Sequence, residues 1–334
     1  MGFRLIDQKC RINSSRSSQA SDTPQFAWPS LLDCFYRNNG KILAILPRNI
    51  ERSVDEKKWI DHVQAKGTRA VYALQTAERI RVSVRCAIVS CAVTHANALT
   101  IAALRKQPTV IASEPMSASF LKHSEEQTVV AIETVRAAIG QFTEPQPEFR
   151  DWGVVAAANF FGRIQIARSI TAYPTDGAWG VSPHLIPHQS LHAISGTLSQ
   201  SLKAYGPNFG VGGGPNSVRE ALLLAASLLA DSSLPGLWLI LTGYESERIP
   251  SADANVTPTP NCCGIAMALR PTIDATYGPE LRLGEAANDD AIRWLAEPQL
   301  DAIAEAVAQR QSTRWRVGGR IVAELDFAGD LEAR

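Results

Sequence analysis

The side chains best suited to chemistry lie in the middle of the chain. His184, His188 and His192 recur at intervals of four, which would place them on one face of a helix, although Pro187 interrupts that segment. Three imidazoles could bind a metal ion, and the alternative is that they are ordinary surface or supporting histidines. Ser217 could act as a nucleophile at the start of a helix, but it would need a nearby base.

A run of three glycines precedes Ser217. The segment Gly212-Gly213-Gly214-Pro215-Asn216-Ser217 could bind a phosphate group through backbone N–H groups at the start of the following helix. It is not a Walker loop, because no Gly-Lys-Ser/Thr follows. The overlapping segment Gly210-Val211-Gly212-Gly213-Gly214-Pro215 fails the dinucleotide fingerprint GxGxxG in its last position. The alternative is that these glycines allow close backbone packing.

The cysteines predict neither disulfides nor a metal site. The adjacent pair Cys262-Cys263 cannot easily share a tetrahedral metal or pair with itself, and no CxxC spacing occurs. We expect small, reduced thiols in a cytoplasmic protein, and we predict no metal and no other cofactor. The six cysteines are Cys10, Cys34, Cys86, Cys91, Cys262 and Cys263.

Hydrophobic periodicity predicts the elements that position these residues. Helices are expected at Ala96–Leu104, Glu125–Ile139, Leu191–Leu202 and Val218–Ala230, with two more between Ala287 and Gln309. Strands are expected at Arg81–Val93, Trp152–Ala158, Phe209–Val211, Leu237–Thr242 and Gly264–Leu269, and a loop at Tyr173–Pro187. This mixture predicts an α/β fold with a mainly parallel sheet.

Composition narrows the classes of function. The 334 residues include 33 Lys and Arg and 33 Asp and Glu, and this neutral balance argues against sequence-independent binding of nucleic acid. The sequence contains no run of 18 apolar residues, so we expect no membrane span. Met1–Asp22 lacks the apolar region of a signal peptide. We expect residues 1–25 to form a disordered tail, and residues 26–80 to form an extension that we cannot assign.

The segment from Pro183 to Glu247 resembles the β-ketoacyl synthases of the thiolase superfamily. The resemblance lies in an ordered series: the turn Gly206-Pro207-Asn208, the strand Phe209–Val211, the glycine turn, the buried helix Val218–Ala230, and the strand Leu237–Thr242 ending in Gly243-Tyr244-Glu245. More loosely it covers Val82–Pro271. It implies a thiolase-like layered fold that is mainly the N-terminal half, with a ketosynthase-like domain at 81–271 and a short helical C-terminal region at 272–334.

The sequence departs from this family where the family does its chemistry. Ketosynthases acylate a cysteine at the start of the buried helix and use two histidines from the second half of the fold. Counted from Gly206-Pro207-Asn208, the cysteine position is Pro215, which cannot carry an acyl group, and no histidine follows His192. The chain therefore resembles catalytically inactive, chain-length-factor-type subunits. Its alternatives are an acyltransferase using Ser217 or Cys263, and a truncated remnant without activity.

The resemblance also implies partners in fatty-acid or polyketide biosynthesis. In the family, dimers form along the strand that precedes the nucleophile, so we expect this chain to bind an active ketosynthase subunit or a second copy of itself. An acidic acyl carrier protein could dock on a local basic patch. The expected binding or interface residues are Gly206, Pro207, Asn208, Phe209, Val211, Gly212, Gly213 and Gly214.

Overall fold

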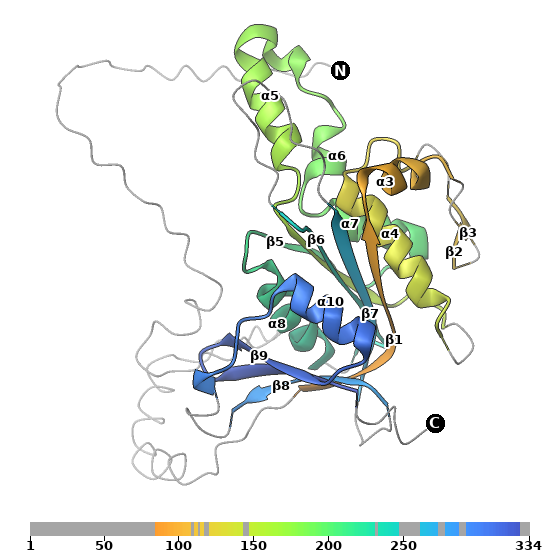
Figure 1. Ribbon diagram of the computed structural model, residues 1–334. Helices are drawn as coiled ribbons and strands as arrows, with labels where there is room; N and C mark the ends of the chain where they lie inside the picture. Colours follow the sequence, from red (N-terminus) through yellow and green to blue (C-terminus); the bar gives the residue numbers. More distant parts are fainter. Residues whose placement is uncertain are drawn as a thin grey trace, which may run out of the picture. The chain divides into compact units, whose positions relative to one another are not determined.

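A computed structural model describes most of the chain after residue 83 (Figure 1). The described residues are 84–107, 110–112, 114–116, 120–142, 147–230, 233–246, 261–272, 278–286 and 292–327. The predicted tail at 1–25 and the extension at 26–80 lie outside these ranges.

The described residues form an eight-stranded sheet in the order β5-β4-β6-β7-β1-β8-β10-β9. Only β4, β5 and β6 run parallel, and every other neighbouring pair is antiparallel. The strands are β1 Val84–Ala96, β4 Gly153–Asn159, β5 Asn208–Gly213, β6 Leu237–Tyr244, β7 Cys262–Pro271, β8 Glu280–Glu285, β9 Thr313–Gly318 and β10 Ile321–Asp326. A separate short hairpin joins β2 Val110–Ile111 to β3 Glu114–Pro115.

The expected mixed α/β fold is confirmed, but the expectation of a mainly parallel sheet is wrong. Hydrophobic runs show that a strand is buried and do not show its direction, because a central antiparallel strand with both faces covered is also continuously apolar. β6 and β7 illustrate this: both are almost wholly buried, and they pair antiparallel.

Helices cover both faces of the sheet and divide the core into two layers. On one face, α4 (Glu126–Ile139) packs on β6, β7 and β1, and α7 (Ala193–Leu202) packs on β4 and β5. On the other face, α8 (Ser217–Ala230) and α10 (Leu300–Gln309) pack on alternate residues of β6. This alternation follows from the two-residue period of a strand. The predicted central position of α8 is confirmed.

The remaining helices lie at the margins of these layers. α3 (Ala98–Leu104) begins at Asn97, whose side chain accepts a hydrogen bond from the Thr100 backbone N–H. The segment Tyr173–Pro187 was expected to be a loop, and this is wrong in part. It contains the end of α5 (Arg163–Asp176), a 3₁₀ turn (Gly177–Gly180) and the start of α6 (Leu185–Gln189). None of the helices among the described residues is long and apolar enough to cross a membrane.

The C-terminal region, residues 272–334, was expected to be helical, but its described part contains strands as well as a helix. It supplies α10, but it also supplies β8, β9 and β10, which extend the sheet beyond β1 (Figure 1). Their sequences alternate apolar and charged residues, as in Arg314, Trp315 and Arg316, because one face packs on α8 and α10 and the other carries ion pairs. The domain limit at residue 271 therefore falls between strands of one continuous sheet.

Candidate functional site

In the turn between β5 and α8, the sequence resemblance predicts that Pro215 replaces the nucleophilic cysteine of ketosynthases. Pro215 lies exposed in this turn, two residues before the first residue of α8. The Ser217 N–H donates to the Gly214 carbonyl, and the Glu220 N–H donates to the Asn216 carbonyl, so the helix begins here. Pro215 offers neither a nucleophilic side chain nor an N–H group to stabilise an oxyanion.

Ser217 is held in place by a partner other than a base. Its side chain is buried, and its Oγ donates a hydrogen bond to Oδ1 of Asn159 at the end of β4. An amide oxygen is too weak a base to activate a hydroxyl for attack. His192 instead lies beside Ser195 in α7, with its Nδ1 3.2 Å from the Ser195 Oγ. Ser217 is thus arranged as a structural hydroxyl.

The glycines of this turn are needed for backbone geometry. Gly212 has a φ of +82°, and a Cβ added to it would lie 2.3 Å from the Cβ of Ser217. A Cβ on Gly210 would lie 2.1 Å from the Leu191 carbonyl oxygen. The phosphate role stays a prediction; the Gly213 carbonyl accepts a hydrogen bond from the Arg163 guanidinium at 3.3 Å. The close-packing alternative accounts for Gly210 and Gly212.

A buried polar network lies behind the turn, and sequence reasoning missed it. Gln127 of α4 donates through Nε2 to the Asn159 carbonyl at 3.0 Å, and the Thr242 Oγ1 donates to Oε1 of Gln127 at 2.9 Å. These bonds tie the carboxyl ends of β4 and β6 to the start of α4. Their only sequence signal is that Asn159 and Thr242 each end an apolar run at the strand ends where parallel sheets place their sites.

A second buried group lies at the start of α4. The Tyr244 hydroxyl donates to Oε1 of Glu125 at 2.5 Å, and its distance to Oε2 of Glu126 is 3.2 Å. Glu125 also caps the helix through Oε2, which accepts from the Gln127 N–H at 2.6 Å. Burial, followed by the charges of Glu125 and Glu126, raises the pKa of Tyr244. Tyr244 therefore stays protonated and serves as a hydrogen-bond donor.

The adjacent cysteines do not form a nucleophilic site. Burial is the main cause that raises the pKa of Cys262 well above its ordinary value, with Glu125 adding to it. Burial, followed by Asp301 and Glu245, raises the pKa of Cys263 to about 12. Both side chains are buried in β7. A thiol with such a pKa carries almost no thiolate at neutral pH, so Cys263 is a poor substitute for the missing cysteine.

The structure brings together only two of the three histidines that the sequence spacing groups. His184 stacks on His123 with ring centroids 4.3 Å apart, and His188 lies 5.8 Å from His184, whereas His192 belongs to the Ser195 contact described above. Within the described ranges, no group of three or more His, Cys, Asp or Glu residues is arranged to hold a metal ion. His123 gave no sequence signal, because it lies 61 positions before His184.

No protein-family profile and no curated protein sequence matches this chain. Among solved structures, a ketosynthase in complex with its chain length factor from Xenorhabdus doucetiae shares 12% identity at a TM-score of 0.45, over 73% of this chain and 99% of that one. The ishigamide ketosynthase/chain length factor shares 15% identity at a TM-score of 0.47, over 72% and 99%.

A third solved structure is a type II polyketide synthase acyl carrier protein in complex with its ketosynthase. It shares 13% identity at a TM-score of 0.40, over 57% of this chain and 63% of that one. Each of these three structures contains a ketosynthase.

Proposed function

We propose that this chain is a non-condensing, ketosynthase-like subunit that pairs with an active ketosynthase in polyketide or fatty-acid assembly. The observation that carries the proposal is the start of α8, where Pro215 lies at the position that the sequence resemblance assigns to the nucleophile and Ser217 donates to an amide oxygen. Cys263, the other local candidate, is buried with a pKa of about 12. Such a subunit would complete an interface and shape the space for an acyl chain, and it would not itself catalyse the condensation.

The proposed interface is β5. Within the described sheet, β5 pairs with β4 on one side and has no neighbouring strand on the other. An edge strand presents backbone N–H and C=O groups that a strand of another chain can pair with. Phe209 lies on this edge strand and is partly exposed. The turn Gly206-Pro207-Asn208 fixes the strand's entry, since the Pro207 carbonyl accepts from the Val154 N–H.

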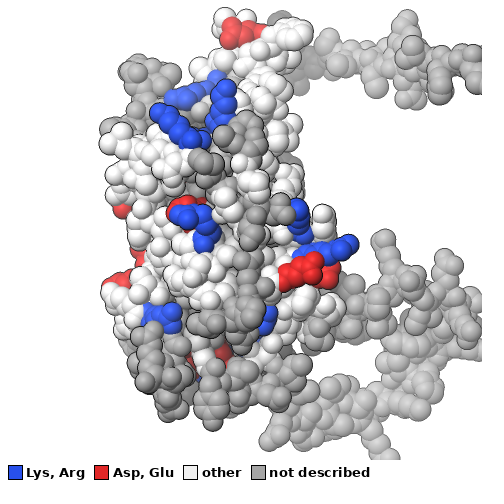
Figure 2. All heavy atoms as spheres, turned by 90° about the vertical axis from the view of Figure 1, so that its right-hand side faces the viewer, with Lys and Arg blue, Asp and Glu red and all other residues white. Residues whose placement is uncertain are grey.

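An acyl carrier protein is the second proposed partner. Arg105 and Lys122 line a pocket of about 300 Å³ together with His123. Figure 2 shows a group of Lys and Arg side chains on the upper part of the face that carries α3, with further basic and acidic side chains scattered below it. An acidic carrier protein would be attracted to such a group, and its binding would weaken as salt rises.

The pairing is tested with the full chain, alone and co-expressed with a full-length ketosynthase from the same genome. Light scattering after size exclusion should show a 1:1 complex. Phe209→Lys should abolish it, because an edge lysine opposes strand addition. Leu99→Lys, on the exposed face of α3, is the matched control and should leave it intact. A chain that stays monomeric in both preparations would refute the interface.

The absence of condensing chemistry is tested separately by intact mass. The full chain is incubated with a hexanoyl thioester, with an active ketosynthase as the positive control. The chain should gain no acyl mass. An adduct that is lost in Ser217→Ala would instead assign the chain to the acyltransferase alternative.

A further inference from the structure

The segment that joins β4 to β5 through α5 and α6, which we call the excursion, exposes an unusual amount of apolar surface. α5 is 14 residues long, and Ile164 is its one buried residue. Ile166, Ile170 and Tyr173 recur at positions i, i+4 and i+7 and form an exposed stripe, with Ile170 67% and Tyr173 56% exposed. The α5–α6 surface, as we name it, consists of Ile166, Ile170, Tyr173, Trp179 and Ile186, and Trp179 is 98% exposed.

This helix has little to hold it in the described chain. A helix of this length is marginal in water, and most helices in proteins gain their stability by packing an apolar face on a neighbour. Pro174 within α5 removes one further backbone hydrogen bond. Figure 1 shows α5 standing clear of the sheet and its covering helices. Exposed apolar side chains gathered on one element indicate an interaction site.

The base of this excursion adjoins the open edge of the sheet. The Arg163 guanidinium donates to the Gly213 carbonyl at the end of β5. Leu191, which follows α6 and is partly exposed, packs so closely on Gly213 that an added Cβ would lie 3.0 Å from its side chain. Phe209 is exposed on the same strand. The base of the α5–α6 surface therefore lies beside the strand that is proposed to bind the partner.

We infer that the α5–α6 surface binds the ketosynthase that pairs with β5, so that one partner covers both the edge strand and the protruding helix. This inference rests on the proposed function and adds to it the residues that anchor the partner. Large aromatic and aliphatic side chains at the centre of an interface supply most of its binding energy. Trp179, Tyr173 and Ile170 are residues of this kind.

A lipid surface is the competing occupant, and the charges disfavour it. Helices that lie on membranes carry several Lys or Arg residues beside their apolar face. α5 carries only Arg163 and Arg168, with Asp176 at its far end, and α6 carries no Lys or Arg. The side chains on this excursion therefore fit a protein partner better than an anionic membrane.

The test measures the affinity of full-length variants for the co-expressed ketosynthase of the same genome by calorimetry or light scattering. Ile170→Ser and Trp179→Ser should each weaken binding at least tenfold. Trp294→Ser, at an 82% exposed tryptophan before α10, is the matched control and should bind within twofold of the unaltered chain. Circular dichroism verifies that all three variants fold.

The outcomes separate this inference from the proposed function. If Phe209→Lys abolishes pairing while Ile170→Ser and Trp179→Ser bind within twofold of the unaltered chain, the β5 interface stands and the inference is overturned. If no ketosynthase binds at all, both are overturned. A homodimer that these variants dissolve would assign the surface to a second copy. Flotation with phosphatidylcholine–phosphatidylglycerol vesicles, lost in Trp179→Ser, would assign it to a membrane, and either result would overturn the inference.

Discussion

The hydroxyl of Ser217 donates a hydrogen bond to the side-chain oxygen of Asn159, which joins the first turn of α8 to the carboxyl end of β4. Asn159 is also tied to α4, because its backbone carbonyl accepts from the Gln127 side chain. A chain of hydrogen bonds therefore joins α8, β4 and α4 beside the turn to which the sequence resemblance assigns the nucleophile.

Ser217→Ala should destabilise the protein without affecting any acyl transfer. It removes a buried hydrogen bond and leaves the Asn159 oxygen without this donor, which costs about 1–2 kcal/mol in the free energy of unfolding. Ser227→Ala, at an exposed serine of the same helix, is the control and should change that free energy by less than about 0.5 kcal/mol. Urea unfolding followed by circular dichroism measures both. Equal effects in the two variants would contradict the structural role of Ser217.

Gly212→Ala should be far more disruptive than Gly214→Ala. Gly212 has a positive φ, and an added Cβ would collide with Ser217, whereas a Cβ on Gly214 would meet no atom within 4 Å. We expect Gly212→Ala to lower the free energy of unfolding by about 1–3 kcal/mol and Gly214→Ala to change it by less than about 0.5 kcal/mol. Thermal unfolding of the two variants gives the comparison. A similar loss at both glycines would argue against the turn geometry.

Strong hydrophobic patterns allowed the sequence to predict the central elements. Helix α4 and helix α8 were expected within a residue of their observed bounds, because apolar residues recur at helical spacing. β6 and β7 were expected because their apolar runs are short and continuous. Such patterns reflect burial directly, so they predict an element without knowledge of the tertiary structure.

Other elements could not be predicted because their signals are weak or ambiguous. α5 contains Pro174, which is unfavourable inside a helix. It also buries only one residue, so its sequence carries little of the apolar pattern that burial produces. β9 alternates Arg314, Trp315, Arg316 and Val317 over only six residues, and no strand was expected there. The contacts of the candidate site depend on residues that are far apart in the chain, and nothing in the local sequence links them.

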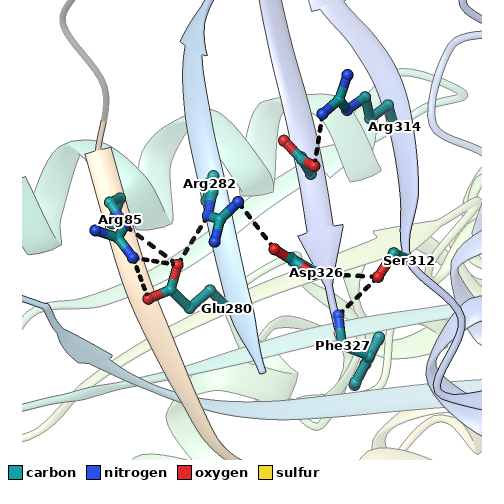
Figure 3. Close-up of polar contacts among 8 residues, drawn as sticks. Arg85, Glu280, Arg282, Ser312, Arg314, Asp326 and Phe327 are labelled. Atoms are coloured by element: carbon teal, nitrogen blue, oxygen red, sulfur yellow. Dashed lines mark hydrogen bonds and ion pairs between the residues drawn. The ribbon is translucent and has the colours of Figure 1, made fainter. Parts of the chain in front are cut away.

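A buried carboxylate should make stability fall in acid. Glu280 of β8 lies between Arg85 and Arg282, and Arg282 also pairs with Asp326 (Figure 3). Burial acts to raise the pKa of Glu280, but the hydrogen bonds and charges of the two arginines outweigh it and hold the pKa below its usual range. The stabilisation is therefore complete above the unfolded-state pKa of about 4.3 and is lost as the pH falls through the lower folded value.

Glu280→Gln should reveal this contribution at neutral pH. We expect the free energy of unfolding at pH 7 to fall by about 1–3 kcal/mol, less than for a fully buried pair because both arginines are partly exposed to water. Glu324→Gln, which breaks the more exposed pair with Arg314, is the control and should cost less than about 1 kcal/mol. The gap between Glu280→Gln and the unaltered chain should narrow below pH 4. A gap that is constant from pH 7 to pH 3 would contradict this account.

The thiols of the described core should be unreactive in the folded protein. Burial raises the pKa of Cys86 to about 12 with help from Glu280, and it raises those of Cys262 and Cys263 as well. In a Cys10→Ser/Cys34→Ser background, Ellman's reagent at pH 8 should label almost no thiol in the native state and four in urea. Rapid labelling of the native chain would contradict the burial of these side chains.

Pro215→Cys in that same background restores a thiol to the nucleophile position and tests what the start of α8 would do to it. The position is exposed, and the N-terminus of a helix stabilises a thiolate. Ser227→Cys places an equally exposed thiol in the third turn of α8 and serves as the control. At pH 7 the thiol of Pro215→Cys should react about three- to tenfold faster with Ellman's reagent. If its rate does not exceed that of the control, the helix start gives no activation. Proline would then not be the sole difference between this turn and one that can be acylated.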